Sequence, residues 1–251
     1  MIETSGSRSP RIGSTAKWLA IGCCVVLAAV AGVVVVGRLI GQQAAIKSGF
    51  YTEGRRLVGS ATFDGPAGAP PSQEYFGFDL GTGVSGWGNN EQQVYTDSTD
   101  NARLNGDGML VIEARRSGGG FTSARLVTRG KAGFTDGLLE ARIKMPSGLG
   151  LHPAFWLLGS NIEQVGYPGS GEIDVVELVD NGNTYHNAIH GPMTVDPSEK
   201  WKQSHDGPFG TDLSADFHVY QAYREDGLIR IGIDGQVVGE YRRDTIPAGA
   251  D

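Results

Sequence analysis

The stretch that most constrains this chain is GEIDVVEL at residues 171–178, in which Ile and Val separate three carboxylates within six positions. Clustered β-branched residues predict a strand. Side chains alternate along a strand, so Glu172 and Asp174 share one face and Glu177 points to the other. A β-bulge between Asp174 and Glu177 adds one residue and returns Glu177 to the first face. We expect this bulge and three acids on one surface, the alternative being an exposed strand with a chance charge pattern.

Paired carboxylates on one surface have a specific chemical use. A retaining glycosidase holds two of them about 5–5.5 Å apart, one to attack the anomeric carbon and one to move a proton. The pattern at Glu172 and Glu177 therefore predicts cleavage of a glycosidic bond with retention of configuration.

The rest of the sequence indicates an all-β fold. Short apolar runs are broken by Gly, Asn, Asp and Pro, 39 of the 251 residues are glycine, and no long helical period appears. Residues 217–223, 229–233 and 237–241 are typical of strands, and Asp234-Gly235 predicts a hairpin turn between the last two. Many strands at short spacing predict an antiparallel β-sandwich or jelly roll.

The N-terminal region predicts a membrane anchor. Residues 19–37 carry no charge. This run is long enough for a helix to span a bilayer, and basic residues precede it. Cleavage after Ala29-Val30-Ala31 and secretion is the alternative. We expect a cytoplasmic tail at 1–17, a transmembrane helix at 18–40, a linker at 41–58 and an extracytoplasmic catalytic domain at 59–251.

Charge and cysteine usage exclude some partners. The whole chain has a net charge of −7, and its first 50 residues hold five Lys or Arg and one Glu, so the remainder carries 16 basic and 27 acidic residues, a net charge of −11. An acidic exported domain is a poor partner for nucleic acid or anionic lipid, and a neutral substrate suits it better. Adjacent Cys23 and Cys24 imply no disulfide framework. We expect a monomer without a cofactor or a metal site.

Five motifs in a fixed order carry a family resemblance. They are WGNNE at 87–91, FTSAR at 121–125, EARIK at 140–144, PAFW at 153–156 and GEIDVVE at 171–177. The series resembles glycoside hydrolase family 16, in its laminarinase (endo-β-1,3-glucanase) branch, over roughly residues 60–251 as judged by motif order. The resemblance implies a concanavalin A-like jelly roll with a β-glucan cleft on its concave sheet.

The resemblance also implies roles for the three acids. Glu172 matches the nucleophile, Glu177 the general acid/base and Asp174 the carboxylate between them. We expect the charge of Asp174 and the apolar Val175 and Val176 to raise the pKa of Glu177, and Glu172 to be ionised at working pH.

Further residues are candidates for binding sugar. Trp87 is expected to line the cleft, with Asn89 offering amide hydrogen bonds to hydroxyl groups. Trp156 is either a sugar platform or a packed sandwich residue, and Arg125 either reaches a hydroxyl or sits in a cross-strand charge ladder. In the family a histidine near position 190 lies beside the catalytic acids, which favours His190 for the site.

Two alternatives concern neighbouring residues. His190 shares a strand face with His186, so an ordinary hydrogen-bonded histidine pair is the other interpretation. Trp201 lies in a polar stretch that we expect to form a loop over the cleft.

Three departures from the family pattern stand out. His152 replaces the usual Trp before Pro-Ala-Phe-Trp, which predicts the loss of an aromatic platform. Tyr167-Pro168 replaces a Trp-Pro pair. The chain ends at Asp251, where relatives continue with strands that complete both sheets and, in many, supply a calcium ligand. We therefore expect C-terminal strands to be missing and a structural calcium to be doubtful.

Several functions fit these observations. The first is a retaining endo-β-1,3-glucanase, and a transglycosylase using the same glycosyl-enzyme is its neighbour. The second is a non-catalytic glucan-binding module, whose class loses the catalytic carboxylates that this chain retains. The third is an inactive truncated relative.

Overall fold

The computed structural model describes residue 50 and residues 55–247, 249 and 250. The chain divides into two compact units, Met1–Thr52 and Glu53–Asp251, and the strands described below belong to the second. The predicted tail, the predicted transmembrane helix and most of the predicted linker lie outside the described residues. Within the residues that are described, no helix is long and apolar enough to cross a membrane.

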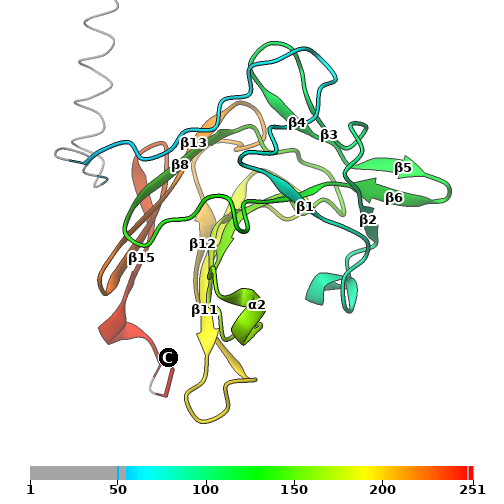
Figure 1. Cartoon of the computed structure of the whole chain (residues 1–251). Helices are drawn as coiled ribbons and strands as arrows, with labels where there is room; N and C mark the ends of the chain where they lie inside the picture. The colour runs from blue at the N-terminus through cyan, green and yellow to red at the C-terminus, as the bar shows by residue number, and fades with distance from the viewer. Residues whose placement is uncertain (1–49, 51–54, 248, 251) are drawn as a thin grey trace, which may run out of the picture. The chain divides into compact units, whose positions relative to one another are not determined.

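In the described part of the chain, two four-stranded antiparallel sheets form the body of the second unit (Figure 1). The first has the order β12-β11-β10-β9, with bounds Lys200–Pro208, Thr184–Pro192, Glu172–Glu177 and Ala154–Leu158. The second has the order β15-β14-β13-β8, with bounds Gln236–Arg242, Leu228–Ile233, His218–Glu225 and Gly137–Ile143. The predicted all-β antiparallel sandwich is confirmed.

Shorter strands lie apart from β11 and β15, where Figure 1 draws them in cyan and green. β1 (Gly77–Asp79) pairs with β7 (Arg125–Val127), and β3 (Ala102–Leu104) with β4 (Leu110–Ile112). β6 (Gly120–Ser123) lies between β2 (Gln93–Tyr95) and β5 (Arg115–Ser117). Short helical turns occupy Gly86–Asn90 (η1), Ile162–Val165 (α2) and Arg243–Thr245 (η2).

The C-terminal hairpin follows local turn chemistry. Ile233 pairs with Gln236, so Asp234 and Gly235 form a two-residue connection between β14 and β15. Their φ angles are 50° and 79°, the left-handed values that a tight hairpin turn requires at both central positions. The turn predicted from Asp234-Gly235 is confirmed.

The hydrophobic core lies between the two sheets. Val176 on β10, Ile189 on β11, Tyr220 on β13 and Ile231 on β14 are all buried in one cluster. Because β10 turns its apolar side chains toward this core, its opposite face is left for the acids. The core therefore fixes which face of the sheet carries the candidate site.

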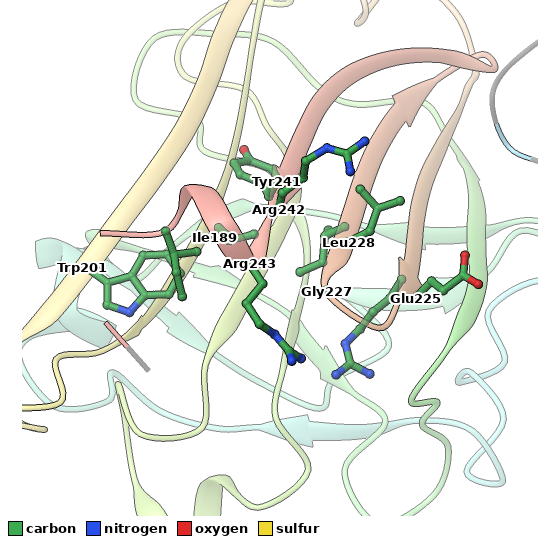
Figure 2. A pocket seen from close by; sticks show the side chains of 11 residues that line it. Ile189, Trp201, Glu225, Gly227, Leu228, Tyr241, Arg242 and Arg243 are labelled. Atoms are coloured by element: carbon green, nitrogen blue, oxygen red, sulfur yellow. The ribbon is translucent and has the colours of Figure 1, made fainter. Parts of the chain in front are cut away.

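The prediction that Trp201 lies in a loop over the cleft is wrong. It lies on β12 and is only 9% exposed, where a loop over the cleft was expected. Lys200 and Lys202 on either side are exposed, so strand alternation turns Trp201 to the opposite, inner face. Figure 2 shows Trp201 beside Ile189 in a pocket whose lining includes Tyr241 and Arg243. The pocket has a volume of about 170 Å³.

Candidate active site

The bulge predicted in β10 is confirmed. Glu172 lies opposite His190 and Asp174 opposite Ala188 on β11, and the register then shifts so that Glu177 lies opposite His186. The pairing with β9 shifts in the same segment, between Asp174 and Val176. Because directly opposed residues share a face, Glu172, Asp174 and Glu177 all point to one side of the sheet.

Each acid belongs to a row of side chains that crosses the sheet from β9 to β12. The three rows are Leu158, Glu172, His190 and Lys202; Trp156, Asp174, Ala188 and Ser204; and Ala154, Glu177, His186 and Asp206. Ile189 and Trp201, which alternate with these residues, point to the core. The site face thus combines carboxylates, histidines and one lysine on a rigid sheet.

Asp174 and His190 form a nearly buried pair. His190 Nε2 lies 3.0 Å from Asp174 Oδ2, and the two side chains are 8% and 6% exposed. An ionised carboxylate only accepts hydrogen bonds, so Nε2 donates and fixes the ring. His186 instead bonds Asp206 through Nδ1 at 2.8 Å. His190 therefore lies beside the acids, as predicted, and the alternative of a His186–His190 hydrogen-bonded pair is wrong.

The surroundings of Glu172 favour its protonated form. Burial is the largest influence and the charge of Asp174 the next, and together they raise the pKa of Glu172 to about 7, while His190 and a Tyr167 hydrogen bond oppose the rise. Glu172 was expected to be ionised at working pH, and a pKa of about 7 makes this true only above neutral pH. The sequence shows the three acids but not how deeply each is buried.

The pKa of Glu177 was predicted to be raised, but the structure lowers it. Burial raises the pKa of Glu177, but the hydrogen bond and charge of His152, helped by Lys202 and His186, outweigh burial and lower it. His152 Nε2 lies 2.8 Å from Glu177 Oε1. The expected rise fails because the effects of His152, 25 residues away in the chain, together with those of Lys202 and His186, outweigh the effect of burial on the pKa of Glu177.

Arg125 joins two of the predicted sugar-binding tryptophans. Its guanidinium carbon lies 4.4 Å from the ring centre of Trp87 and 4.5 Å from that of Trp156. Its Nε donates to Asp79 Oδ2 at 3.2 Å, and Asp79 is its direct partner across β1 and β7. The cross-strand charge pair is thus the interpretation that the contacts support. Trp156 lies on the site face beside Asp174, and Arg125 occupies one side of its ring.

Trp87 and Asn89 lie together in η1. Trp87 has a φ of 54°, an uncommon value for an aromatic residue, and its ring packs against Tyr95 with centres 5.8 Å apart. Asn89 is exposed and its Nδ2 donates to Glu91 Oε1 at 3.4 Å. Tyr95 OH donates to Glu91 Oε2 at 2.8 Å, so Glu91 organises this loop.

Sequence reasoning missed the roles of three residues. His152 and Tyr167 were noted only as departures from the family pattern, yet they contact Glu177 and Glu172. Glu91 closes the WGNNE motif, and its charge acts on His152. The place of Glu91 in the WGNNE motif was a sequence signal that could have drawn attention to it. The contact between His152 and Glu177 had no such signal, because it depends on the fold. Among the residues described, no group of three His, Cys, Asp or Glu side chains is arranged to hold a metal ion.

The arrangement suits a two-step displacement. Tyr167 and Asp174 act on Glu172 through hydrogen bonds, and Glu172 lies on the same face as Glu177. The partner of Glu177 is His152, and an imidazole exchanges protons near neutral pH. One carboxylate can attack while the other first gives and then takes a proton.

Comparison with known proteins shows which family this chain resembles. Residues 87–249 match the model of glycosyl hydrolases family 16. A beta-glucanase from Rhodothermus marinus is 43% identical over 141 residues, covering 53% of this chain and 48% of that protein. A glucan endo-1,3-beta-glucosidase from Cryptopygus antarcticus is 39% identical over 153 residues, covering 57% of this chain and 54% of that protein. The chain thus spans about half the length of these curated relatives.

A solved structure supports the same assignment. The endo-beta-1,3-glucanase from Pyrococcus furiosus is 37% identical, with a TM-score of 0.65, and the match covers 77% of this chain and 76% of that one. The likeness confirms the predicted jelly roll for the described residues. The family match contains every strand from β2 to β15, and with them the whole acid-bearing sheet. This chain therefore belongs to family 16 of the glycosyl hydrolases.

Proposed function

We propose that this protein is a retaining endo-β-1,3-glucanase. The observation that carries the proposal is the β10 bulge, which brings Glu177 onto the face of Glu172 and Asp174. The beta-glucanase and endo-1,3-beta-glucosidase relatives support β-1,3-glucan as the substrate. An acidic protein with a net charge of −7 also suits a neutral polysaccharide.

The reaction proceeds in two steps. In the first, the Glu172 carboxylate forms a bond to the anomeric carbon, the glycosidic C–O bond breaks with its electrons going to oxygen, and Glu177 protonates that oxygen. In the second, Glu177 takes a proton from water, whose oxygen attacks the anomeric carbon and releases Glu172. Asp174, held by His190, lies next to Glu172 in the site and influences its protonation.

Sugar binding is proposed for the side chains around the acids. Trp156 lies directly beside Asp174 on the site face, so a sugar ring bound over the acids would meet it. Arg125 contacts the rings of both Trp87 and Trp156, and exposed Asn89, two residues after Trp87, offers an amide group. We assign Trp87, Asn89, Arg125, Trp156 and His190 to substrate binding or to its support.

The direct test is release of reducing ends from laminarin by the purified protein. We expect activity in the wild type and its loss in Glu172→Gln, which keeps the shape of the nucleophile but not its charge. Asp206→Asn, on the same sheet face but two strands away, is the control and should retain activity. Proton NMR of early products should show the β-anomer first, and an initial α-anomer would contradict retention.

Product analysis separates the remaining functions. Longer oligosaccharides formed from short β-glucans would indicate a transglycosylase, because the glycosyl-enzyme passes to a sugar instead of water. Binding to laminarin without release of any product would support a glucan-binding module.

We also propose that residues 18–40 anchor the protein in a membrane with its sandwich outside the cytoplasm. The support is the uncharged run at 19–37 and the basic residues before it. Fractionation should leave the full-length chain in the membrane pellet. A shorter secreted species that starts near Gly32 would show that the run is a cleaved signal.

A further inference from the structure

His152 is held beside Glu177 by backbone contacts of the segment before β9. Gly148 N donates to the Asp180 carbonyl at 2.8 Å, and Asp180 N donates to the Leu151 carbonyl at 3.1 Å. Gly150 N adds a bond of 2.7 Å to the Asp180 carboxylate. Because this loop is tied to the chain just after β10, the imidazole reaches Glu177 from a fixed position.

The His152–Glu177 contact involves one oxygen of the carboxylate. Nε2 lies 2.8 Å from Oε1, and both side chains are partly exposed on the site face. The charged and titratable groups around the pair come from several elements. They are Glu91 after η1, Asp174 on β10, His186 on β11, and Lys202 and Asp206 on β12.

The two partners change each other's proton affinity. The hydrogen bond to Glu177 raises the pKa of His152 against the opposing effect of burial, and the charges of Glu177, Glu91 and Asp174 add to the rise. The same contact lowers the pKa of Glu177. Such a pair titrates in two joint steps, so its last proton is lost at a higher pH than Glu177 alone would lose it.

The raised pKa of Glu172 explains why the His152–Glu177 pair must keep a proton at neutral pH. With a pKa of about 7, Glu172 becomes an ionised nucleophile only from neutral pH upward. At that pH an unassisted Glu177 carboxyl would have lost the proton that the leaving oxygen needs. An imidazole in direct contact still holds a proton in this range.

We propose that His152 is a positioning residue whose Nε2–H holds Oε1 of Glu177, and that the pair shares one proton for the leaving oxygen. The inference rests on the function proposed above. In one arrangement an imidazolium faces a carboxylate. In the other the ring has released its Nδ1 proton to solvent and keeps its Nε2–H, and Oε2 of Glu177 has taken a proton from solvent, so the partly exposed pair holds the same number of protons in both arrangements.

The proton balance closes over both steps. From the second arrangement Oε2 protonates the glycosidic oxygen as the C–O bond breaks, and Glu177 remains a carboxylate bonded to Nε2–H. When water attacks the glycosyl-enzyme, Oε2 takes its proton and the pair regains the one it had. His152 remains a hydrogen-bond donor throughout, so Glu177 does not need to reorient between steps.

The pH profile of kcat/KM on laminarin tests this role. His152→Gln keeps a donor but cannot titrate, so we expect the basic limb to move to lower pH by about one unit, the size of shift that one charged partner produces. His152→Ala should show the same shift and a lower maximum. His186→Gln, an adjacent histidine bonded to Asp206, should move the limb less. A uniform loss of activity with an unmoved basic limb would show a purely structural role and overturn the proposal.

A second measurement does not need activity. The His152 ring is followed by nitrogen NMR in the full-length chain and assigned by its disappearance in His152→Gln. Glu177→Gln should lower the pKa of His152 by about one unit, because the charged partner is removed. An unchanged pKa would overturn the shared proton even if laminarin is cleaved. A lowered pKa in a protein that cleaves no glucan would leave the pair standing and contradict the proposed function.

Discussion

Glu172 and Glu177 lie on the same face of β10, yet their surroundings shift their pKa values in opposite directions. Burial and Asp174 act on Glu172, whereas His152 acts on Glu177. Two carboxylates whose environments separate their pKa values are the usual basis for different roles in catalysis. Below a pH of about 7 the Glu172 carboxyl is protonated, and it must ionise before it can attack.

The acidic limb of activity should therefore belong to Glu172. Since its pKa is about 7, kcat/KM should rise with pH through this region. Asp174→Asn removes the neighbouring charge that helps to raise this pKa, so the limb should move to lower pH, together with a lower maximum because His190 loses its charged partner. The profile of Asp206→Asn serves as the control. If the acidic limb stays in place in Asp174→Asn, Asp174 does not control the protonation of Glu172.

Glu172 should also reduce the stability of the fold at neutral pH. Its folded pKa lies above the unfolded value, so the unfolded chain loses this proton first and stability falls as pH rises from about 4.5 to 7. Glu172→Gln removes that penalty, and thermal unfolding at pH 8 should occur at higher temperature than in the wild type. Each kcal/mol gained corresponds to about 2–4 °C in a domain of this size. At pH 4 the two proteins should unfold alike, and an equal gain at both pH values would exclude the ionisation as the cause.

At the scale of elements, the bulge in β10 determines which faces its side chains occupy, and the turn between β14 and β15 determines how these two strands pair. The bulge gives one strand both a core face, with Val176, and a site face, with Glu172 and Glu177. The turn at Asp234 and Gly235 is further tied to β13, since Val219 N donates to Asp234 Oδ1 and Gly235 N to the Gln221 side chain, at 2.8 and 2.7 Å. Local backbone geometry thus sets the register of both sheets.

Gly235→Ala should destabilise the hairpin. Its φ of 79° lies in the left-handed region, where a Cβ costs about 1–2 kcal/mol. Gly133→Ala is the matched control, because that glycine has no positive φ and an added Cβ would meet nothing within 4 Å. Urea unfolding should place the midpoint of Gly235→Ala well below that of Gly133→Ala. Equal midpoints would show that the turn tolerates a side chain.

At the scale of the whole molecule, the described residues of Glu53–Asp251 are held by one core between two sheets. Leu213, in the connection between β12 and β13, is fully buried in that core, and its backbone N–H bonds the Gly182 carbonyl at 2.8 Å. Packing at this point therefore links a loop to both sheets. Loss of core volume should weaken the fold without altering the protonation of the site.

Leu213→Ala should lower the free energy of unfolding by about 2–5 kcal/mol, the range for a buried leucine. Leu149→Ala, at a position 94% exposed, removes the same atoms from the surface and should change stability little. In folded Leu213→Ala the limbs of the pH profile should coincide with those of the wild type. A displaced limb would mean that this part of the core controls the site.

The sequence by itself determined the features that depend on neighbouring residues. The spacing of Glu172, Asp174 and Glu177 required a bulge to bring them together, and Asp234-Gly235 specified a tight turn, because strand alternation and backbone φ preferences are local properties. The order of five motifs was also sufficient to indicate the family. These predictions needed no knowledge of which strands are neighbours.

The tertiary structure decided where protons and rings lie. His152 reaches Glu177 across 25 residues of chain, and Arg125 reaches Asp79 across 46. A pKa depends on burial and on charges brought close in space, so the identity of the protonated glutamate could not be read from residues 171–178. Trp201 faces the core because its strand alternates against a sheet that only the folded chain assembles.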